Sequence, residues 1–174
     1  PNKPAIDSAL VNRGVHVVHQ DKPKGLVDAV QCGQIQAGDS DCLIALPDVM
    51  FTEGNPSEIL CKEFRGDCTL AIVRTESPWA DHLSDTGRVT KLDGNWILDI
   101  SGKNPSEPFP LGEYRVTGRA IWTQAFWEVA ENDEVAALRI LASAGNLRAS
   151  IVKTPYIDVG LTIGYKYAQS IFNQ

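Results

Sequence analysis

Two largely apolar runs, CLIALP (42–47) and CTLAIVR (68–74), constrain the fold of this chain more than any other feature of its sequence. A short run of this kind is typical of a strand that is buried on both faces, as in a sheet covered by helices. GVHVV (14–18) is predicted to be a further strand that precedes them. The sequence therefore predicts a buried sheet rather than a helical bundle.

Helical segments alternate with the predicted strands. Helices are expected at 25–33, 57–64, 123–132, 133–145 and 162–172, and further strands at 113–122 and 147–154. Asp93-Gly94 in the middle of 87–101 is a strong β-hairpin signal. We expect an α/β fold, a Rossmann-like three-layer sandwich with a mainly parallel sheet and an antiparallel β-hairpin insertion. No repeat or linker divides the chain, so residues 1–174 are predicted to form a single domain.

The composition argues against several classes of binding partner and location. A net charge of −6 and a pI near 5.0, without any Lys/Arg-rich run, argue against a nucleic-acid partner. No apolar stretch approaches the length of a membrane span, and the N-terminus lacks the layout of a signal peptide. The four cysteines form no Cys-x-x-Cys pair, which argues against zinc and for reduced, mostly buried thiols in a cytoplasmic protein. They are Cys32, Cys42, Cys61 and Cys68.

Polar residues at the ends of predicted strands are the first candidates for a functional site. Gln20 follows GVHVV, and Gly25 follows five residues later; together they fit either an ordinary turn or a site that reads the edge of a base. Asp48 follows CLIALP and fits either a metal ligand or a cap of the next element. Asp158 lies at another strand end, so the two carboxylates could converge on one hard cation such as Mg²⁺.

Two cationic side chains lie beside glycines, where the backbone can approach a ligand. Lys103 is in SGKNP and Arg119 is in VTGRAIW. Most loop lysines are merely solvated, so Lys103 by itself is a weak candidate. The three histidines match no catalytic arrangement with a serine or cysteine and are interpreted as incidental; they are His16, His19 and His82.

Four blocks, in order, resemble the sugar-phosphate nucleotidylyltransferases, and among these the bacterial UTP–glucose-1-phosphate uridylyltransferases. The first is HQDKPKGLVDAVQCGQIQAGDSDCLIALPDVMF, where Gln, a Gly-Leu pair, a helix and a strand closing on Pro-Asp follow one another. The others are YRVTGRAIW, NDEVAALRILASAGNLRA and PYIDVGLTIGYKYAQSIF. The resemblance runs from about residue 14 to the end of the sequence.

This resemblance implies roles for the candidate residues. Gln20 and the backbone of Gly25 would contact the nucleotide base, and Asp48 and Asp158 would hold the catalytic Mg²⁺. The substrates would be a nucleoside triphosphate, with UTP favoured, and a sugar-1-phosphate, with glucose-1-phosphate favoured. The product would be an NDP-sugar for polysaccharide biosynthesis. A homo-oligomer is compatible with the sequence, which does not set the number of subunits.

The same resemblance implies which residues would contact the sugar and its phosphate. Gly87 and Gly118 would line the sugar pocket, and Lys103 would pair with the phosphate of the sugar-1-phosphate. That phosphate would attack the α-phosphorus of the triphosphate and release pyrophosphate, a reaction governed by in-line positioning and charge neutralisation.

The sequence departs from the family at two places. The 174 residues contain no Gly-Gly-x-Gly-x-Arg loop, the segment that cradles the triphosphate in the family. Either the sequence is part of a longer protein, or the chain is a truncated relative. The glutamate that touches sugar hydroxyls in the family is replaced by Gly102. The alternative to an enzyme is therefore a non-catalytic module or subunit that binds a nucleotide sugar.

Overall fold

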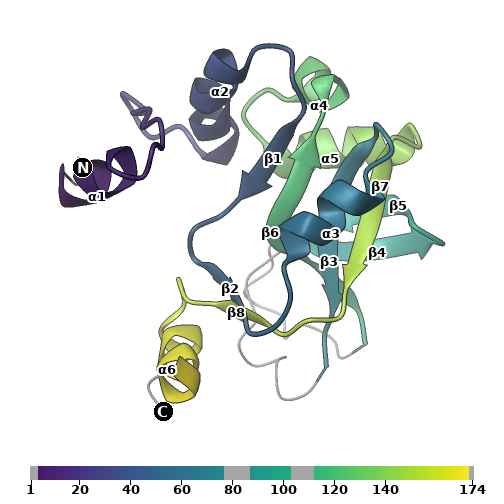
Figure 1. The fold of residues 1–174 in the computed structure, drawn as a ribbon. Coiled ribbons are helices and arrows are strands. Elements are labelled where there is room, and N and C mark those ends of the chain that lie inside the picture. Colours follow the sequence, from purple (N-terminus) through teal and green to yellow (C-terminus); the bar gives the residue numbers. More distant parts are fainter. Residues whose placement is uncertain (1–3, 77–86, 103–111, 173–174) are drawn as a thin grey trace.

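The computed structural model describes residues 4–76, 87–102 and 112–172. The helices are α1 (Pro4–Val11), α2 (Leu26–Ala37), α3 (Pro56–Glu63), α4 (Gln124–Val129), α5 (Glu134–Ser143) and α6 (Thr162–Phe172). The strands are β1 (Cys42–Ala45), β2 (Val49–Phe51), β3 (Cys68–Arg74), β4 (Arg88–Asp93), β5 (Trp96–Ser101), β6 (Tyr114–Trp122), β7 (Leu147–Val152) and β8 (Tyr156–Asp158). Helices and strands alternate along much of the chain, as an α/β fold requires (Figure 1).

Six strands form the main sheet in the order β1-β6-β3-β7-β5-β4. The start of β6 also pairs with β4, so β6, β3, β7, β5 and β4 complete a closed circuit of pairings. The other half of β6 pairs with β1. The predicted hairpin is present as β4 and β5, which meet at Asp93 and Trp96 around the Asp93-Gly94 turn.

The expectation of a mainly parallel sheet is wrong. Among the strand pairings of the described residues, β3–β7 is parallel, and the other pairings of the main sheet are antiparallel. The direction of β6 decides this, because β6 runs against β1, β3 and β4. Apolar content indicates that a strand is buried, but it does not encode the direction of the neighbouring strand.

Helices cover both faces of β3, the central strand. Leu70 and Ile72 belong to the core cluster that includes Leu138 of α5, whereas Ala71 packs in a second cluster with Leu60 of α3. The first six residues of β3 are buried, as its largely apolar run predicts. Burial of this kind stabilises a fold by about 25 cal/mol per Å² of apolar surface, so β3 and the helices on its two faces contribute strongly to the stability of the fold.

Two predicted strands differ from expectation. GVHVV forms no strand; Val15 and Val18 are 44% and 45% exposed, so no sheet covers them. CLIALP does form β1, but its residues alternate between half-buried and exposed, because β1 pairs with β6 alone within the described sheet. The prediction of mostly buried thiols is also wrong in part: Cys68 is buried, whereas Cys61 is exposed.

A second, two-stranded sheet lies apart from the main one. β2 pairs antiparallel with β8, and in Figure 1 this pair lies between the main sheet and α6. The helix α6 approaches β8 so closely that a Cβ on Gly164 would lie 1.9 Å from the carbonyl oxygen of Asp158. None of the helices in the described ranges is long and apolar enough to cross a membrane.

Candidate functional site

The pairing of β2 with β8 brings Asp48 and Asp158 together. Val49, directly after Asp48, lies opposite Asp158 in the β2–β8 register. The backbone N–H of Val159 donates to the carbonyl of Asp48 at 2.8 Å. The alternative was that Asp48 caps the next element; that element is the strand β2, so Asp48 lies in a turn and has no helix N-terminus to cap.

Both carboxylates face the same point beside Gly160. A Cβ built on Gly160 would lie 3.0 Å from Oδ1 of Asp158 and 3.1 Å from Oδ2 of Asp48. The Oδ1 atom of Asp158 also accepts the backbone N–H of Gly160 at 2.9 Å, which fixes the orientation of this carboxylate. Two carboxylates that share one space are hard oxygen donors of the kind that Mg²⁺ prefers. The pair fits such an ion, and a glycine at 160 leaves the space between the two carboxylates open.

Arg119 holds the segment that carries Asp48. Its guanidinium donates to the carbonyls of Leu46 at 2.8 Å and Val49 at 3.3 Å, on either side of Asp48. The same group lies 5.5 Å from the ring centre of Phe51. Burial lowers the pKa of Arg119, and the nearby Tyr156 and Asp48 oppose that shift. The sequence singled out Arg119 as a ligand contact, but in the structure it clamps the backbone around a carboxylate.

Gly118 permits the close packing of this segment on β6. It adopts φ +69°, and a Cβ there would lie 3.0 Å from Cδ1 of Leu46 and 3.1 Å from Cγ2 of Val49. The backbone N–H of Leu46 donates to the Gly118 carbonyl at 3.0 Å. The predicted role of Gly118 was to line a pocket; its geometry shows that it also sets how near the Asp48 segment lies to the sheet.

One pocket of about 150 Å³ unites four of the predicted residues. They are Asp48, Asp158, Gly87 and Gly118. Ile100 of β5 and Leu138 of α5 give the pocket an apolar side. A concave, partly apolar site with a few convergent polar groups is the usual form of a small-molecule site. The structure therefore brings together, in one pocket, four residues that the sequence analysis singled out.

Tyr156 forms a buried wall of this pocket. Its side chain is 2% exposed, and the guanidinium of the fully buried Arg115 lies 5.1 Å from its ring centre. Burial raises the pKa of the Tyr156 phenol well above its ordinary range, while the charge of Arg115 opposes that rise. The phenol is therefore a neutral group at physiological pH. Sequence analysis missed both residues; a tyrosine two positions before a predicted metal ligand was the available signal.

The predicted base contacts lie outside this pocket. The side-chain amide of Gln20 donates to a carboxylate oxygen of Asp28 and to the carbonyl of Gly25 at 3.4 Å. Gly25, with φ +111°, ends the loop before α2, and a Cβ there would lie 3.9 Å from the Asn132 carbonyl. Gln20 and Gly25 thus contact one another, but neither lines the pocket of Asp48, where a base site beside the metal would place them. Lys103 and His82 lie outside the described residues.

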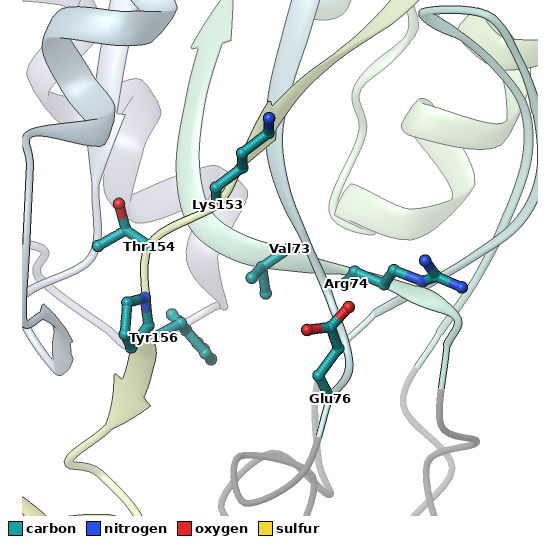
Figure 2. Close-up of a pocket in the computed structure, with 7 residues that line it drawn as sticks. Val73, Arg74, Glu76, Lys153, Thr154 and Tyr156 are labelled. Carbon is teal, nitrogen blue, oxygen red and sulfur yellow. The ribbon is translucent and has the colours of Figure 1, made fainter.

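A smaller pocket of about 70 Å³ lies next to Tyr156 (Figure 2). It is formed by the end of β3 and the β7–β8 connection, including Arg74 and Lys153. Figure 2 shows these two cationic side chains extending in different directions. The Nε atom of Arg74 donates to the carbonyl of Gly112 at 3.1 Å. The two cations do not converge, so this pocket lacks the arrangement that would bind a phosphate group.

Comparison with known proteins relates this geometry to one group of enzymes. The chain is 23% identical over 181 aligned positions to the UTP–glucose-1-phosphate uridylyltransferase of Salmonella typhimurium. The match covers 87% of this chain and 58% of that relative, so the chain spans little more than half its length. No family model matches the chain.

Solved structures give the clearer likeness. The UDP-glucose pyrophosphorylase complexed with UDP-glucose matches with a TM-score of 0.72 at 22% identity, over 99% of this chain and 74% of its own. The UTP-bound UGPase from Acinetobacter baumannii matches with a TM-score of 0.69 at 19% identity. That match covers 99% of this chain and 70% of the UGPase chain. The chain has the fold of the sugar-nucleotide pyrophosphorylases.

A third structure with this pyrophosphorylase fold is a putative glucose-1-phosphate thymidylyltransferase from Bacillus anthracis, in complex with a sucrose. Its TM-score is 0.71 at 17% identity, over 97% of this chain and 71% of its own. The resemblance inferred from the four sequence blocks is therefore confirmed at the level of fold. The Asp48–Asp158 pocket lies within the part of the chain that these alignments cover.

Proposed function

We propose that this chain contributes the sugar and metal subsites of a nucleotidylyltransferase. The reaction joins a nucleoside triphosphate, with UTP favoured, to a sugar-1-phosphate, with glucose-1-phosphate favoured. A phosphate oxygen of the sugar-1-phosphate attacks the α-phosphorus, the bond from that phosphorus to the bridging oxygen breaks, and pyrophosphate leaves. The NDP-sugar retains the sugar's own phosphate, so all atoms balance.

The observation that carries this proposal is the pair of carboxylates facing one point at the wall of a partly apolar pocket. Asp48 and Asp158 would hold Mg²⁺ there, since both present oxygens within 3.1 Å of the position beside Gly160. A bound Mg²⁺ supplies positive charge that offsets the negative charge of the phosphates in the transition state. Arg119 holds the backbone on either side of Asp48, and the Gly160 amide orients the Asp158 carboxylate; both contacts favour a preorganised site.

The remaining residues would bind and orient the sugar. Gly87 and Gly118 let the ring approach the backbone of the pocket, and Leu138 and Ile100 cover its apolar face. Lys103 would neutralise the sugar phosphate, and Gln20 with Gly25 would contact the base. The uridine and glucose preferences are supported by the relatives whose names specify UTP, UDP-glucose and glucose-1-phosphate.

Calorimetry with UDP-glucose tests the proposal. The 174-residue chain is expected to bind UDP-glucose in the presence of Mg²⁺ and to bind it more weakly with EDTA. Asp48→Asn and Asp158→Asn should each remove the Mg²⁺ dependence. The control is Glu53→Gln, which makes the same carboxylate-to-amide change at an exposed residue two positions after β2. This variant should keep the Mg²⁺ dependence of binding. Binding that is independent of Mg²⁺ in all four proteins would contradict the metal assignment.

The same experiment separates an enzyme from a binding module. A Mg²⁺-dependent complex together with pyrophosphate release from UTP and glucose-1-phosphate identifies the enzyme. A complex without turnover in any longer form of the protein that contains this chain identifies the nucleotide-sugar-binding module.

A further inference from the structure

Tyr156 places a hydroxyl group without a protein partner in the wall of the Asp48–Asp158 pocket. Its side chain is 2% exposed and lines that pocket. A tyrosine buried to this extent usually hydrogen-bonds through its O–H group. Within the described residues, the ring of Tyr156 contacts Phe51 and Arg115, and no hydrogen bond engages its hydroxyl. The hydroxyl is therefore a donor that the fold itself does not use.

This hydroxyl differs from the unpaired polar atoms that are sealed inside the core. The Nε1 atoms of Trp122 and Trp127 are closed off from solvent and have no hydrogen-bond partner. The hydroxyl oxygen of Tyr156 is not closed off in this way, although the rest of its side chain is buried. A molecule that fills the pocket can therefore reach it.

The strand β8 directs Tyr156 toward the carboxylate pair. Tyr156 and Asp158 are two residues apart on β8, so their side chains project from the same face of the strand. Phe51 lies opposite Tyr156 in the β2–β8 register, and the centres of their rings are 5.8 Å apart. The guanidinium of Arg115 lies 5.1 Å from the centre of the Tyr156 ring. These contacts fix the ring beside the carboxylates before a ligand arrives.

The charges around Tyr156 favour an anionic partner for its hydroxyl. Arg115 is fully buried against the Tyr156 ring, and the guanidinium of Arg119 lies 5.5 Å from the ring centre of Phe51. A phenol O–H donates to a charged oxygen about twice as strongly as to a neutral one. Asp48 and Asp158 would repel an anion, but the Mg²⁺ of the proposed function offsets their charge. A phosphate oxygen fits these conditions better than a sugar hydroxyl does.

We propose that Tyr156 is a further substrate-binding residue, whose hydroxyl donates a hydrogen bond to a phosphate oxygen of the sugar-1-phosphate. The inference rests on the proposed function, because it places this phosphate in the Asp48–Asp158 pocket. The contact comes from β8 and is separate from Lys103, the residue to which the family resemblance assigns the same phosphate. It provides a neutral donor in addition to the positive charges.

The test measures the affinity of the 174-residue chain for glucose-1-phosphate in the presence of Mg²⁺. Tyr156→Phe removes the hydroxyl and keeps the ring, and it should weaken binding about tenfold, as the loss of a hydrogen bond to a charged group does. Tyr165→Phe is the matched control at a tyrosine that is 53% exposed, and it should leave the affinity unchanged.

A modified ligand separates a contact with the phosphate from a contact with the sugar. In glucose 1-methylphosphonate, a methyl group replaces one phosphate oxygen. This replacement should weaken binding to the wild type more than binding to Tyr156→Phe, because only the wild type has the hydroxyl to lose a partner. Equal weakening in both proteins would reject the phosphate contact, even if Tyr156→Phe binds glucose-1-phosphate less tightly.

Metal affinity separates a direct contact from an effect on Asp158. The affinity for Mn²⁺, measured by electron paramagnetic resonance without ligand, should be the same in the wild type and in Tyr156→Phe. A matching fall in Mn²⁺ affinity would show that the substitution disturbs the carboxylate pair, and it would overturn the inference.

Failure of the inference and failure of the proposed function give different results. Mg²⁺-dependent UDP-glucose binding by the wild type supports the proposed function. If such a protein binds glucose-1-phosphate no more tightly than Tyr156→Phe does, or not at all, Tyr156 is rejected and the proposed function stands. Absence of UDP-glucose binding by the wild type rejects both.

Discussion

The carbonyl of Asp48 accepts a hydrogen bond from the amide of Val159 at 2.8 Å. This bond joins the two carboxylate-bearing segments through their main chains, so it does not depend on either acidic side chain. Replacing Asp48 or Asp158 by asparagine therefore alters charge while leaving the connection intact. Substitutions of these two side chains therefore test the chemistry of the carboxylates and leave the main-chain connection between the two segments in place.

Gly160→Ala is expected to weaken metal binding without unfolding the protein. Its methyl group would lie 3.0 and 3.1 Å from the two carboxylates and occupy the space between them. We expect Mn²⁺ affinity, measured by electron paramagnetic resonance, to fall at least about tenfold, as when the immediate surroundings of a metal site are altered. Gly33→Ala, with no neighbouring atom within 4 Å of the added methyl, is the control. Equal Mn²⁺ affinity in both variants would contradict the shared site.

Arg119→Met should loosen the segment around Asp48. The guanidinium donates to backbone carbonyls on both sides of that residue, and hydrogen bonds from a charged group contribute about 1.5–3 kcal/mol. Hydrogen exchange should accelerate at residues 46–49 but not in β3. Arg119→Lys should not restore protection, because a single ammonium lacks the planar fork that reaches two carbonyls. Full protection in Arg119→Lys would show that charge alone suffices.

Gly118→Ala should destabilise the fold more than an alanine at a glycine of similar backbone conformation. Gly118 and Gly145 adopt φ of +69° and +73°, so both substitutions carry the same strain. Only at Gly118 would the new Cβ also meet Leu46 and Val49 within 3.1 Å, whereas nothing lies within 4 Å at Gly145. Urea denaturation should reveal an additional loss of about 1–3 kcal/mol for Gly118→Ala, the usual cost of overpacking. Equal losses would argue against close packing of the Asp48 segment.

Tyr156 should make the folded state sensitive to alkaline pH. Burial raises the pKa of its phenol above the ordinary value of 10.0, so the folded protein holds this proton more tightly than the unfolded chain. The resulting stability is present below pH 10 and is lost as the pH rises from there toward the raised pKa. The fall in unfolding free energy between about pH 9 and 11 should be smaller in Tyr156→Phe. The same change at Tyr165, which is 53% exposed, should not reduce that fall.

The 174-residue polypeptide by itself is expected to produce no detectable NDP-sugar. Its sequence contains no Gly-Gly-x-Gly-x-Arg loop to hold the triphosphate, and positioning of reactants contributes roughly 7–11 kcal/mol to catalysis. Pyrophosphate release from UTP, glucose-1-phosphate and Mg²⁺ is the measurement. Robust release by a preparation whose intact mass is 19.0 kDa would contradict this expectation. Release by a longer chain that is lost in Asp48→Asn would show instead that the loop lies in another segment.

Sequence patterns predicted the buried centre of this fold better than its edges. The largely apolar run of β3 and the Asp-Gly turn of the β4–β5 hairpin encode their structures locally, and both predictions are confirmed. The similar run of β1 is half-exposed because its surroundings depend on strand order, which no local pattern records. The short strand β2 escaped prediction, since three residues carry too little periodicity to detect.

The residues of the candidate site were predictable where a side chain suited to binding a ligand lies at the end of a predicted strand. Asp48 and Asp158 were found from their positions at the ends of predicted strands, and the structure places their carboxylates beside one another. Tyr156 was not found, because its presence in the pocket depends on how β8 packs. A side chain that reaches a site through tertiary packing leaves no mark in its own sequence neighbourhood.

The pairing of β2 with β8 also determines when the site can form during synthesis. The closed circuit of strands needs no residue beyond Val152, the end of β7. Asp48 leaves the ribosome before most of the main sheet, yet its partner strand β8 follows only after the last strand of that sheet has been made. A nascent chain can therefore acquire its core while it still lacks a metal site. An incomplete product that ended after β7 would be folded at its centre and unable to gather the two carboxylates.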